Sequence, residues 1–298
     1  MNKTIKNLVL SVGVVVFACT ILIFATKERS TTKEVKTVSI MLPAKADFAG
    51  ENAPLHIADV KERFDREMVV NTNLHSNTTL VLKRANRVFP IIEPILKQYG
   101  VPDDFKYLAV IESGLVNVVS PARATGVWQF MEQTAKERGM EVNGIVDERY
   151  HLEKSTEAAC HYLQTAKNRF GNWTLAAAAY NAGIAGINRQ IENQKVDSYY
   201  DLLLVEETSR YVFRILALKE IMQNPVKYGF EIPTEQLYHP IETRKIEVDT
   251  TISDLATFAK NQGINYKILK LHNPWLRDRK LENKSRKKYI IEIPVEGY

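Results

Sequence analysis

The sequence predicts a mainly α-helical protein with a small βααβ unit at its C-terminal end and a transmembrane helix at its N-terminal end. Apolar residues recur at helical spacing through most of residues 57–229. Strand-like alternation of comparable strength begins only beyond Pro240, and residues 8–25 are apolar and uncharged. With 298 residues, of which 45% are hydrophobic and 25% charged, the chain is long enough for one or two packed domains.

The N-terminal segment predicts a membrane anchor over residues 1–26. Its 18 uncharged residues are at the lower end of the length that spans a bilayer. Lys3 and Lys6 precede them, and this position of positive charge favours a cytoplasmic N-terminus with the rest of the chain outside the cytoplasm. The alternative is a lipoprotein cleaved before Cys19. Phe17 is bulky for such a cleavage box and apolar residues continue past Cys19, so an uncleaved anchor is favoured.

A polar linker is predicted over residues 27–55, followed by a helical domain over residues 56–232. Within this domain Pro90 and Pro94 predict a kink or a restart in a long helix. Asp103 is a candidate N-cap and Gly114 a candidate stop for the next helix. Further helices are expected in residues 155–171, 172–183 and 206–224.

The C-terminal domain, residues 240–298, is predicted to be a βααβ unit. "TRKIEVD" and "KKYIIEIPV" alternate as strands, and two short helical segments lie between them. The net charge of +5 is modest, and the basic run Lys284–Lys288 is interpreted as a solvated loop rather than a site for an anionic partner. Cys160 and its neighbour His161 point to different faces of a helix, so no metal is expected, and no cofactor is expected either. A disulfide would have to join Cys19 in the N-terminal apolar segment to Cys160 in a globular helix, so none is expected.

Glu112 is the candidate catalytic residue because it ends a strongly apolar helix. On that helix it shares a face with Phe105, Leu108 and Ala109, and such neighbours disfavour the ionised carboxylate. The negative end of the helix dipole acts in the same direction. A carboxyl that stays protonated near neutral pH can deliver a proton to a leaving oxygen. Trp128, close by in "GVWQFM", is either an apolar platform for a sugar or part of the core.

Four motifs occur in an order that resembles one known family. They are "ESG" (112–114), "GVWQFM" (126–131), "AYNAG" (179–183) and "ETSRYV" (207–212). This pattern is similar to the lytic transglycosylase catalytic domain with a goose-lysozyme-like fold, in particular the membrane-bound type D. The βααβ unit resembles a degenerate LysM module. The usual Gly-Asp before the first helix of that module reads Asp249-Thr250-Thr251 here.

The resemblance implies a periplasmic enzyme that cuts the β-1,4 bond between N-acetylmuramic acid and N-acetylglucosamine in peptidoglycan without water, leaving 1,6-anhydromuramic acid ends. It implies that Glu112 is the acid and then the base. Substrate contacts or orientation of Glu112 are implied for five other residues, which are Ser113, Gln129, Tyr180, Asn181 and Tyr211. Local capping or core packing is the alternative for each of them.

Two other functions share much of this pattern. A hydrolytic muramidase would use the same cleft and activate a water, and a non-catalytic peptidoglycan-binding protein would keep the sugar contacts without using the acid. The intact motif around Glu112 favours an enzyme. Nucleic-acid binding is disfavoured by the N-terminal anchor.

Overall fold

The computed structural model describes residues 40–296. The predicted anchor, residues 1–26, and Cys19 lie outside this range. Within residues 40–296, no helix is both long enough and apolar enough to cross a membrane.

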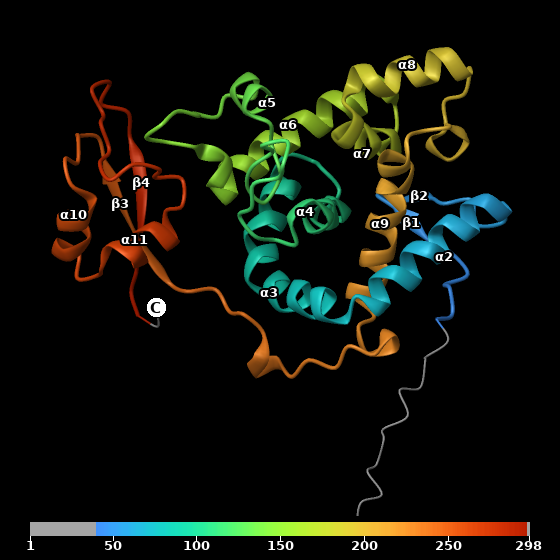
Figure 1. The fold of residues 1–298 in the computed structure, drawn as a ribbon, viewed down its shortest axis with the longest axis horizontal. Helices are drawn as coiled ribbons and strands as arrows, with labels where there is room; N and C mark the ends of the chain where they lie inside the picture. Colours follow the sequence, from blue (N-terminus) through green and yellow to red (C-terminus); the bar gives the residue numbers. More distant parts are fainter. Residues whose placement is uncertain (1–39, 297–298) are drawn as a thin grey trace, which may run out of the picture. The chain divides into compact units, whose positions relative to one another are not determined.

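Most of the described chain forms a helical domain with α4 (Lys106–Ser113) at its centre (Figure 1). Helix α4 packs against α3 and α9, and residues 107–111 are all buried. The α-helices around it are α2 (Ala58–Asn73), α3 (His75–Gln98), α5 (Glu132–Glu137), α6 (Leu152–Phe170), α7 (Trp173–Ala182), α8 (Ile184–Gln194) and α9 (Glu206–Gln223). Short 3-10 helices are η1 (Asp103–Phe105), η2 (Glu148–Tyr150), η3 (Tyr199–Asp201), η4 (Val226–Tyr228) and η5 (Thr234–Gln236).

The predicted ends of two helices have different outcomes. Helix α4 ends where predicted, because Gly114 adopts the left-handed conformation (φ 61°) that favours glycine. Helix α3, by contrast, runs unbroken through Pro90 and Pro94, so the predicted restart is absent. Both prolines lie on the exposed side of α3, where water can satisfy the carbonyl groups that lose a helical hydrogen bond.

Part of the segment predicted as a linker is packed against the helices. Strands β1 (Asp47–Phe48) and β2 (Glu51–Asn52) form a short antiparallel hairpin. The ring of Phe48 is fully buried, 4.9 Å from the ring centre of Phe105. The carboxylate of Glu51 accepts hydrogen bonds from the backbone N–H groups of Trp173 (2.6 Å) and Thr174 (2.8 Å) at the start of α7. The packed part of the chain therefore begins before residue 56.

The C-terminal unit has the predicted βααβ order. Strands β3 (Thr243–Val248) and β4 (Tyr289–Pro294) pair antiparallel, and α10 (Leu255–Asn261) and α11 (Tyr266–His272) lie between them in the sequence. The unit has its own apolar core, to which both strands and both helices contribute. We refer to residues 243–296 as the C-terminal module.

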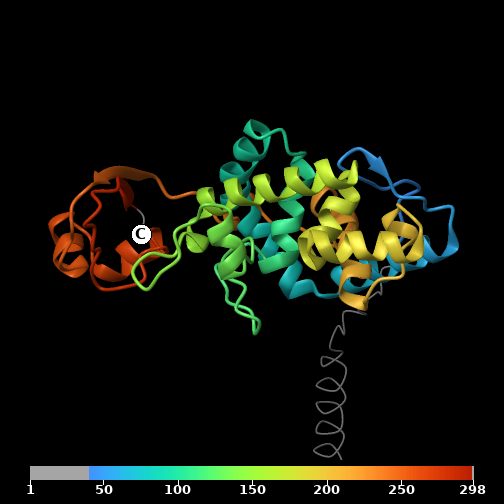
Figure 2. The same ribbon diagram turned by 90° about the horizontal axis from the view of Figure 1, so that it is seen from above.

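A loop of the helical domain completes the core of this module. Figure 2 shows the segment between α5 and α6 reaching the module. Val146, on this loop, is only 1% exposed and belongs to the apolar core of the module. The backbone N–H of Asp147 donates to the carbonyl of Trp275 (2.9 Å), and that of Arg277 donates to the carbonyl of Ile145 (2.7 Å). The module is therefore joined to the helical domain by packing and by backbone hydrogen bonds.

Candidate active site

A groove of about 900 Å³ opens beside the end of α4. Helices α2, α3, α4 and α9 supply its walls, together with the loop after Gly114. Its volume is in the range of sites that bind small molecules or a few sugar units. Several charged side chains line it, namely Glu67, Arg84, Glu112, Glu206, Glu207, Arg210 and Arg214.

Glu112 lies in the last turn of α4, with its side chain part-buried in this groove. The pKa of its carboxyl is raised from 4.5 to about 7, mainly by burial, and the negative charge of Glu207 acts in the same direction. A hydrogen bond from Tyr211 and the positive charge of Arg214 act in the opposite direction and only partly offset burial. The predicted direction is confirmed, and desolvation by burial is its main cause.

Two tyrosines lie close to Glu112, the buried Tyr211 and the part-buried Tyr180. The Tyr211 hydroxyl donates a hydrogen bond to Oε1 of Glu112. The Tyr180 hydroxyl donates to the carbonyl of Trp128 (2.8 Å) instead. Burial raises the pKa of both phenols well above the ordinary value, and the nearby charge of Glu112 raises both further. Both tyrosines therefore stay neutral, and Tyr211 acts as a hydrogen-bond donor to the carboxyl.

Two arginines surround the C-terminal end of α4. Arg214 donates from Nη2 to the carbonyl of Ile111 (3.1 Å), and Arg84 donates from Nη1 to the carbonyl of Gly114 (3.1 Å). They satisfy carbonyl groups that a helix end leaves free, and they place positive charge at the negative end of the helix dipole. Sequence reasoning missed both. The available signal for Arg214 was its position three residues after Tyr211, on the same face of α9.

Asn181, on α7, is held by hydrogen bonds to two residues of α9. Its Nδ2 donates to Oε1 of Glu207 (3.2 Å), and its Oδ1 accepts from the hydroxyl of Thr208 (2.8 Å). Glu207 lines the groove and raises the pKa of Glu112. The two motifs "AYNAG" and "ETSRYV" are thus brought together by side-chain hydrogen bonds.

Ser113 makes only local hydrogen bonds in the described chain. Its Oγ donates to the carbonyl of Ala109 (3.2 Å) and accepts from the backbone N–H of Leu115 (3.1 Å). Its side chain therefore helps to end α4, although Ser113 also lines the groove.

Gln129 does not line the groove. Its side chain instead stabilises the loop over residues 118–130. Its Nε2 donates to the carbonyls of Val118 (3.0 Å) and Gly126 (2.7 Å). Trp128 is 0% exposed, and its indole N–H donates to the hydroxyl of Thr156 (2.8 Å). Of the two interpretations of Trp128, the core interpretation is therefore the one the structure supports.

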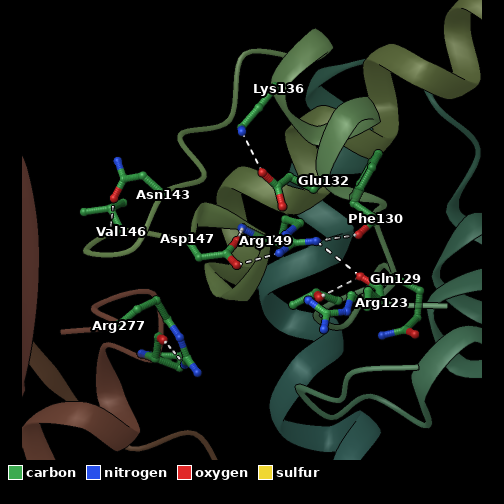
Figure 3. A network of polar contacts seen from close by, with 12 residues as sticks. Arg123, Gln129, Phe130, Glu132, Lys136, Asn143, Val146, Asp147, Arg149 and Arg277 are labelled. Atoms are coloured by element: carbon green, nitrogen blue, oxygen red, sulfur yellow. Dashed lines mark hydrogen bonds and ion pairs between the residues drawn. The ribbon is translucent and has the colours of Figure 1, made fainter. Parts of the chain in front are cut away.

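Arg149 links this loop to the loop that carries Val146 (Figure 3). It pairs with Asp147 through Nε (2.9 Å) and Nη2 (2.8 Å), and it donates from Nη1 to the carbonyl of Phe130 (3.3 Å). The backbone also approaches closely here, since a Cβ at Gly126 would lie 2.0 Å from the carbonyl oxygen of Arg149. Only glycine fits at residue 126 without a backbone shift, and its φ of 89° favours glycine as well.

A buried ion pair occupies the wall of the groove formed by α2 and α9. Glu67 is 1% exposed, and its Oε1 lies 2.7 Å from Nε of Arg210. The charge of Glu67 is thus balanced by Arg210 within the groove wall. Sequence reasoning missed Glu67, and no signal in the sequence distinguishes it from other charged residues of α2. Among residues 40–296 no group of His, Cys, Asp and Glu side chains could hold a metal ion.

Comparison with known proteins agrees with this architecture. Residues 89–202 match the transglycosylase SLT domain, and residues 244–297 match the soluble lytic transglycosylase C-terminal LysM-like domain. The chain therefore contains an SLT transglycosylase domain followed by a LysM-like domain.

The chain is homologous to particular curated proteins as well. It is 28% identical over 247 residues to the membrane-bound lytic murein transglycosylase D of Escherichia coli strain K12, and equally to that of Escherichia coli O6:H1. The alignment covers 76% of this chain and 53% of each relative. The chain thus spans about half the length of the curated relatives that it matches.

Proposed function

We propose that this chain is a peptidoglycan lytic transglycosylase, with Glu112 as its single catalytic acid and base. The observation that carries the proposal is a carboxyl with a pKa of about 7, part-buried in a groove of an SLT domain. At neutral pH such a carboxyl exists in both forms, so it can give a proton in one step and take one in the next.

In the first step Glu112 protonates the oxygen of the β-1,4 bond between N-acetylmuramic acid and N-acetylglucosamine. The bond from this oxygen to C1 of the muramic residue breaks, and the other sugar leaves as an alcohol. The N-acetyl group of the substrate supports the positive charge that develops at C1. This participation replaces the second carboxylate that most glycosidases use.

In the second step the Glu112 carboxylate takes the proton of the C6 hydroxyl of the muramic residue. The C6 oxygen bonds to C1 and closes the 1,6-anhydro ring, so no water is consumed. Tyr211 stabilises the carboxylate between the two steps because its hydroxyl donates to Oε1. Arg214 adds positive charge nearby.

The other predicted site residues act around this carboxyl in the proposal. Asn181, on α7 and hydrogen-bonded to Glu207 of the groove, contacts the sugar, and Tyr180 lies close to Glu112. Gln129 acts through the loop that it holds, since its amide already donates to two carbonyls of that loop. Ser113 sets the end of α4, from which Glu112 projects.

We further propose that the enzyme works outside the cytoplasm, in the periplasm, held to a membrane by residues 1–26. The names of the curated relatives describe membrane-bound proteins. Attachment through a lipid on Cys19 is the alternative.

Product analysis tests the proposed function. Purified peptidoglycan is treated with the wild type and with Glu112→Gln, and the released fragments are measured by mass spectrometry. The proposal expects 1,6-anhydro products from the wild type and none from the variant. Fragments heavier by one water would identify a hydrolytic muramidase, and equal solubilisation by both proteins would identify a non-catalytic binding protein.

A further inference from the structure

A second cavity, of about 470 Å³, lies between the helical domain and the C-terminal module. Helix α3, the loop after Gly114 and residues 150–153 form one side of it. The other side is formed by Glu292 on β4 and by four residues around the end of α11, namely Leu271, His272, Pro274 and Trp275. The cavity exists because Val146 and its loop hold the module against the helical domain.

This cavity continues the groove that contains Glu112. One face of α3 lines both, because successive residues of that face belong first to the groove and then to the cavity. The groove residues are Asn77, Val81 and Arg84, and the cavity residues are Val88 and Ile91. Steps of three and four residues keep all five on one stripe, which extends for about 21 Å at the rise of an α-helix. Val116, after α4, lines both spaces as well.

The lining of the cavity combines apolar and polar side chains. Leu271 offers an apolar side chain that is 63% exposed. Tyr150 and Trp275 complete the apolar wall, with Trp275 buried and its ring stacked on Tyr289. Asn117 and His272 contribute polar groups. Burial lowers the pKa of His272, as does the charge of Arg87, so its imidazole is neutral at neutral pH and can both donate and accept.

The charged residues of the cavity have both signs. Arg87 and Glu153 lie on the side of the helical domain, and Glu292 lies on the side of the module. Mixed charge favours neither an anionic nor a cationic polymer. The polar and charged groups of the cavity can hydrogen-bond to the hydroxyl and N-acetyl groups of a glycan, and its apolar surface can contact the sugar rings.

We propose that the cavity between the helical domain and the C-terminal module binds the part of a glycan strand that extends along α3 beyond the groove. The identity of the ligand rests on the proposed function. In this arrangement the module acts as one wall of an extended substrate site, and long strands gain contacts that short fragments cannot reach.

The test measures binding without catalysis, in a Glu112→Gln background. The probes are a peptidoglycan tetrasaccharide and long uncrosslinked glycan strands. Adding Leu271→Ser and His272→Ala to this background is expected to weaken the binding of long strands about tenfold, with tetrasaccharide binding unchanged within about twofold. Arg87→Ala, on the α3 wall, is expected to give the same pattern from the other side of the cavity.

Val295→Ser is the matched control. Val295 is 55% exposed in the same module and lines neither the groove nor the cavity, so this variant should bind both probes as the background does. Thermal unfolding of every variant confirms that it is folded. The inference is overturned if long strands bind the cavity variants unchanged, or if both probes lose affinity equally. Because the assay needs no turnover, its outcome is separate from that of the product analysis.

Discussion

The hydroxyl of Tyr211 on α9 donates a hydrogen bond to Oε1 of Glu112 on α4, across 99 positions of sequence. This bond favours the charged carboxylate, whereas burial favours the protonated acid. Burial has the larger effect, and the pKa settles at about 7. The two opposing influences keep both protonation states of Glu112 accessible at neutral pH, as a residue that serves first as acid and then as base requires.

Replacing Tyr211 with phenylalanine is expected to raise the pKa of Glu112, because a donor to the charged form is lost. The falling limb of kcat/KM against pH should move up by about one pH unit, and the maximum should drop about tenfold. Tyr228→Phe is the control, because that hydroxyl donates to Glu220 rather than to the site. A falling limb that moves to lower pH in Tyr211→Phe would contradict this account of the hydrogen bond.

Replacing Glu207 with glutamine should shift the same limb in the opposite direction. The negative charge of Glu207 raises the pKa of Glu112, and the variant removes that charge while keeping an oxygen that can accept from Asn181. The midpoint should therefore fall below that of the wild type. Glu206→Gln, one residue earlier and paired with Arg66, should leave the midpoint in place. Equal shifts in both variants would mean that the effect is not specific to Glu207.

Removing the charge of Arg214 is expected to raise the pKa of Glu112. In Arg214→Met the falling limb should move to higher pH, because the positive charge that favours the carboxylate is absent. Arg214→Lys keeps that charge and should retain the wild-type midpoint, even if it loses the hydrogen bond to the Ile111 carbonyl. Wild-type midpoints in both variants would exclude an electrostatic role for Arg214.

The stability of the wild type should depend on pH through Glu112. Its folded pKa is raised, so the folded state binds more protons than the unfolded state between pH 4.5 and about 7, and stability falls as pH rises through this window. Glu112→Gln has no such group. Its stability relative to the wild type should increase from pH 4.5 to 7 by on the order of 2 kcal/mol and then level off. Urea unfolding at pH 4.5 and pH 8 measures the difference, and an equal difference at both pH values would refute the raised pKa.

The close approach at Gly126 makes a prediction about the loop that Gln129 holds. Gly126→Ala places a Cβ 2.0 Å from the carbonyl oxygen of Arg149, at a φ of 89°. We expect a loss of about 2–4 kcal/mol in the free energy of unfolding. Gly144→Ala is the matched control, since a Cβ there meets nothing within 4 Å. Thermal or urea unfolding compares the two variants, and equal stabilities would contradict the close approach.

The sequence predicted those helices and strands that are long enough for their apolar residues to repeat with a helical or strand period. Helical spacing indicated α4 and α9, Gly114 marked the end of α4, and alternation indicated β3 and β4. The hairpin at residues 47–52 escaped notice because each of its strands has only two residues. The docking of Val146 into the module could not be predicted, because it depends on one side chain that packs far from its own sequence neighbours.

The candidate site was predicted as far as local sequence determines it. Leu108 and Ala109, one turn before Glu112, lie on its own helix, so the raised pKa could be expected from spacing alone. Arg84 and Glu67 come from α3 and α2, and only the packing of those helices brings them to the groove. The motif around Trp128 does not indicate whether its side chain is exposed or buried. The structure shows that it is buried and donates a hydrogen bond to Thr156.

A titration of Glu112 itself tests the central claim most directly. Carbon-13 label is placed at the side-chain carboxyl of glutamate, and the signal of Glu112 is assigned by its absence in Glu112→Gln. Followed by NMR in the full-length protein without substrate, this signal should titrate with a midpoint near pH 7. A midpoint near 4.5, the ordinary value for a glutamate, would mean that the carboxyl is charged at neutral pH and cannot act as the proton donor.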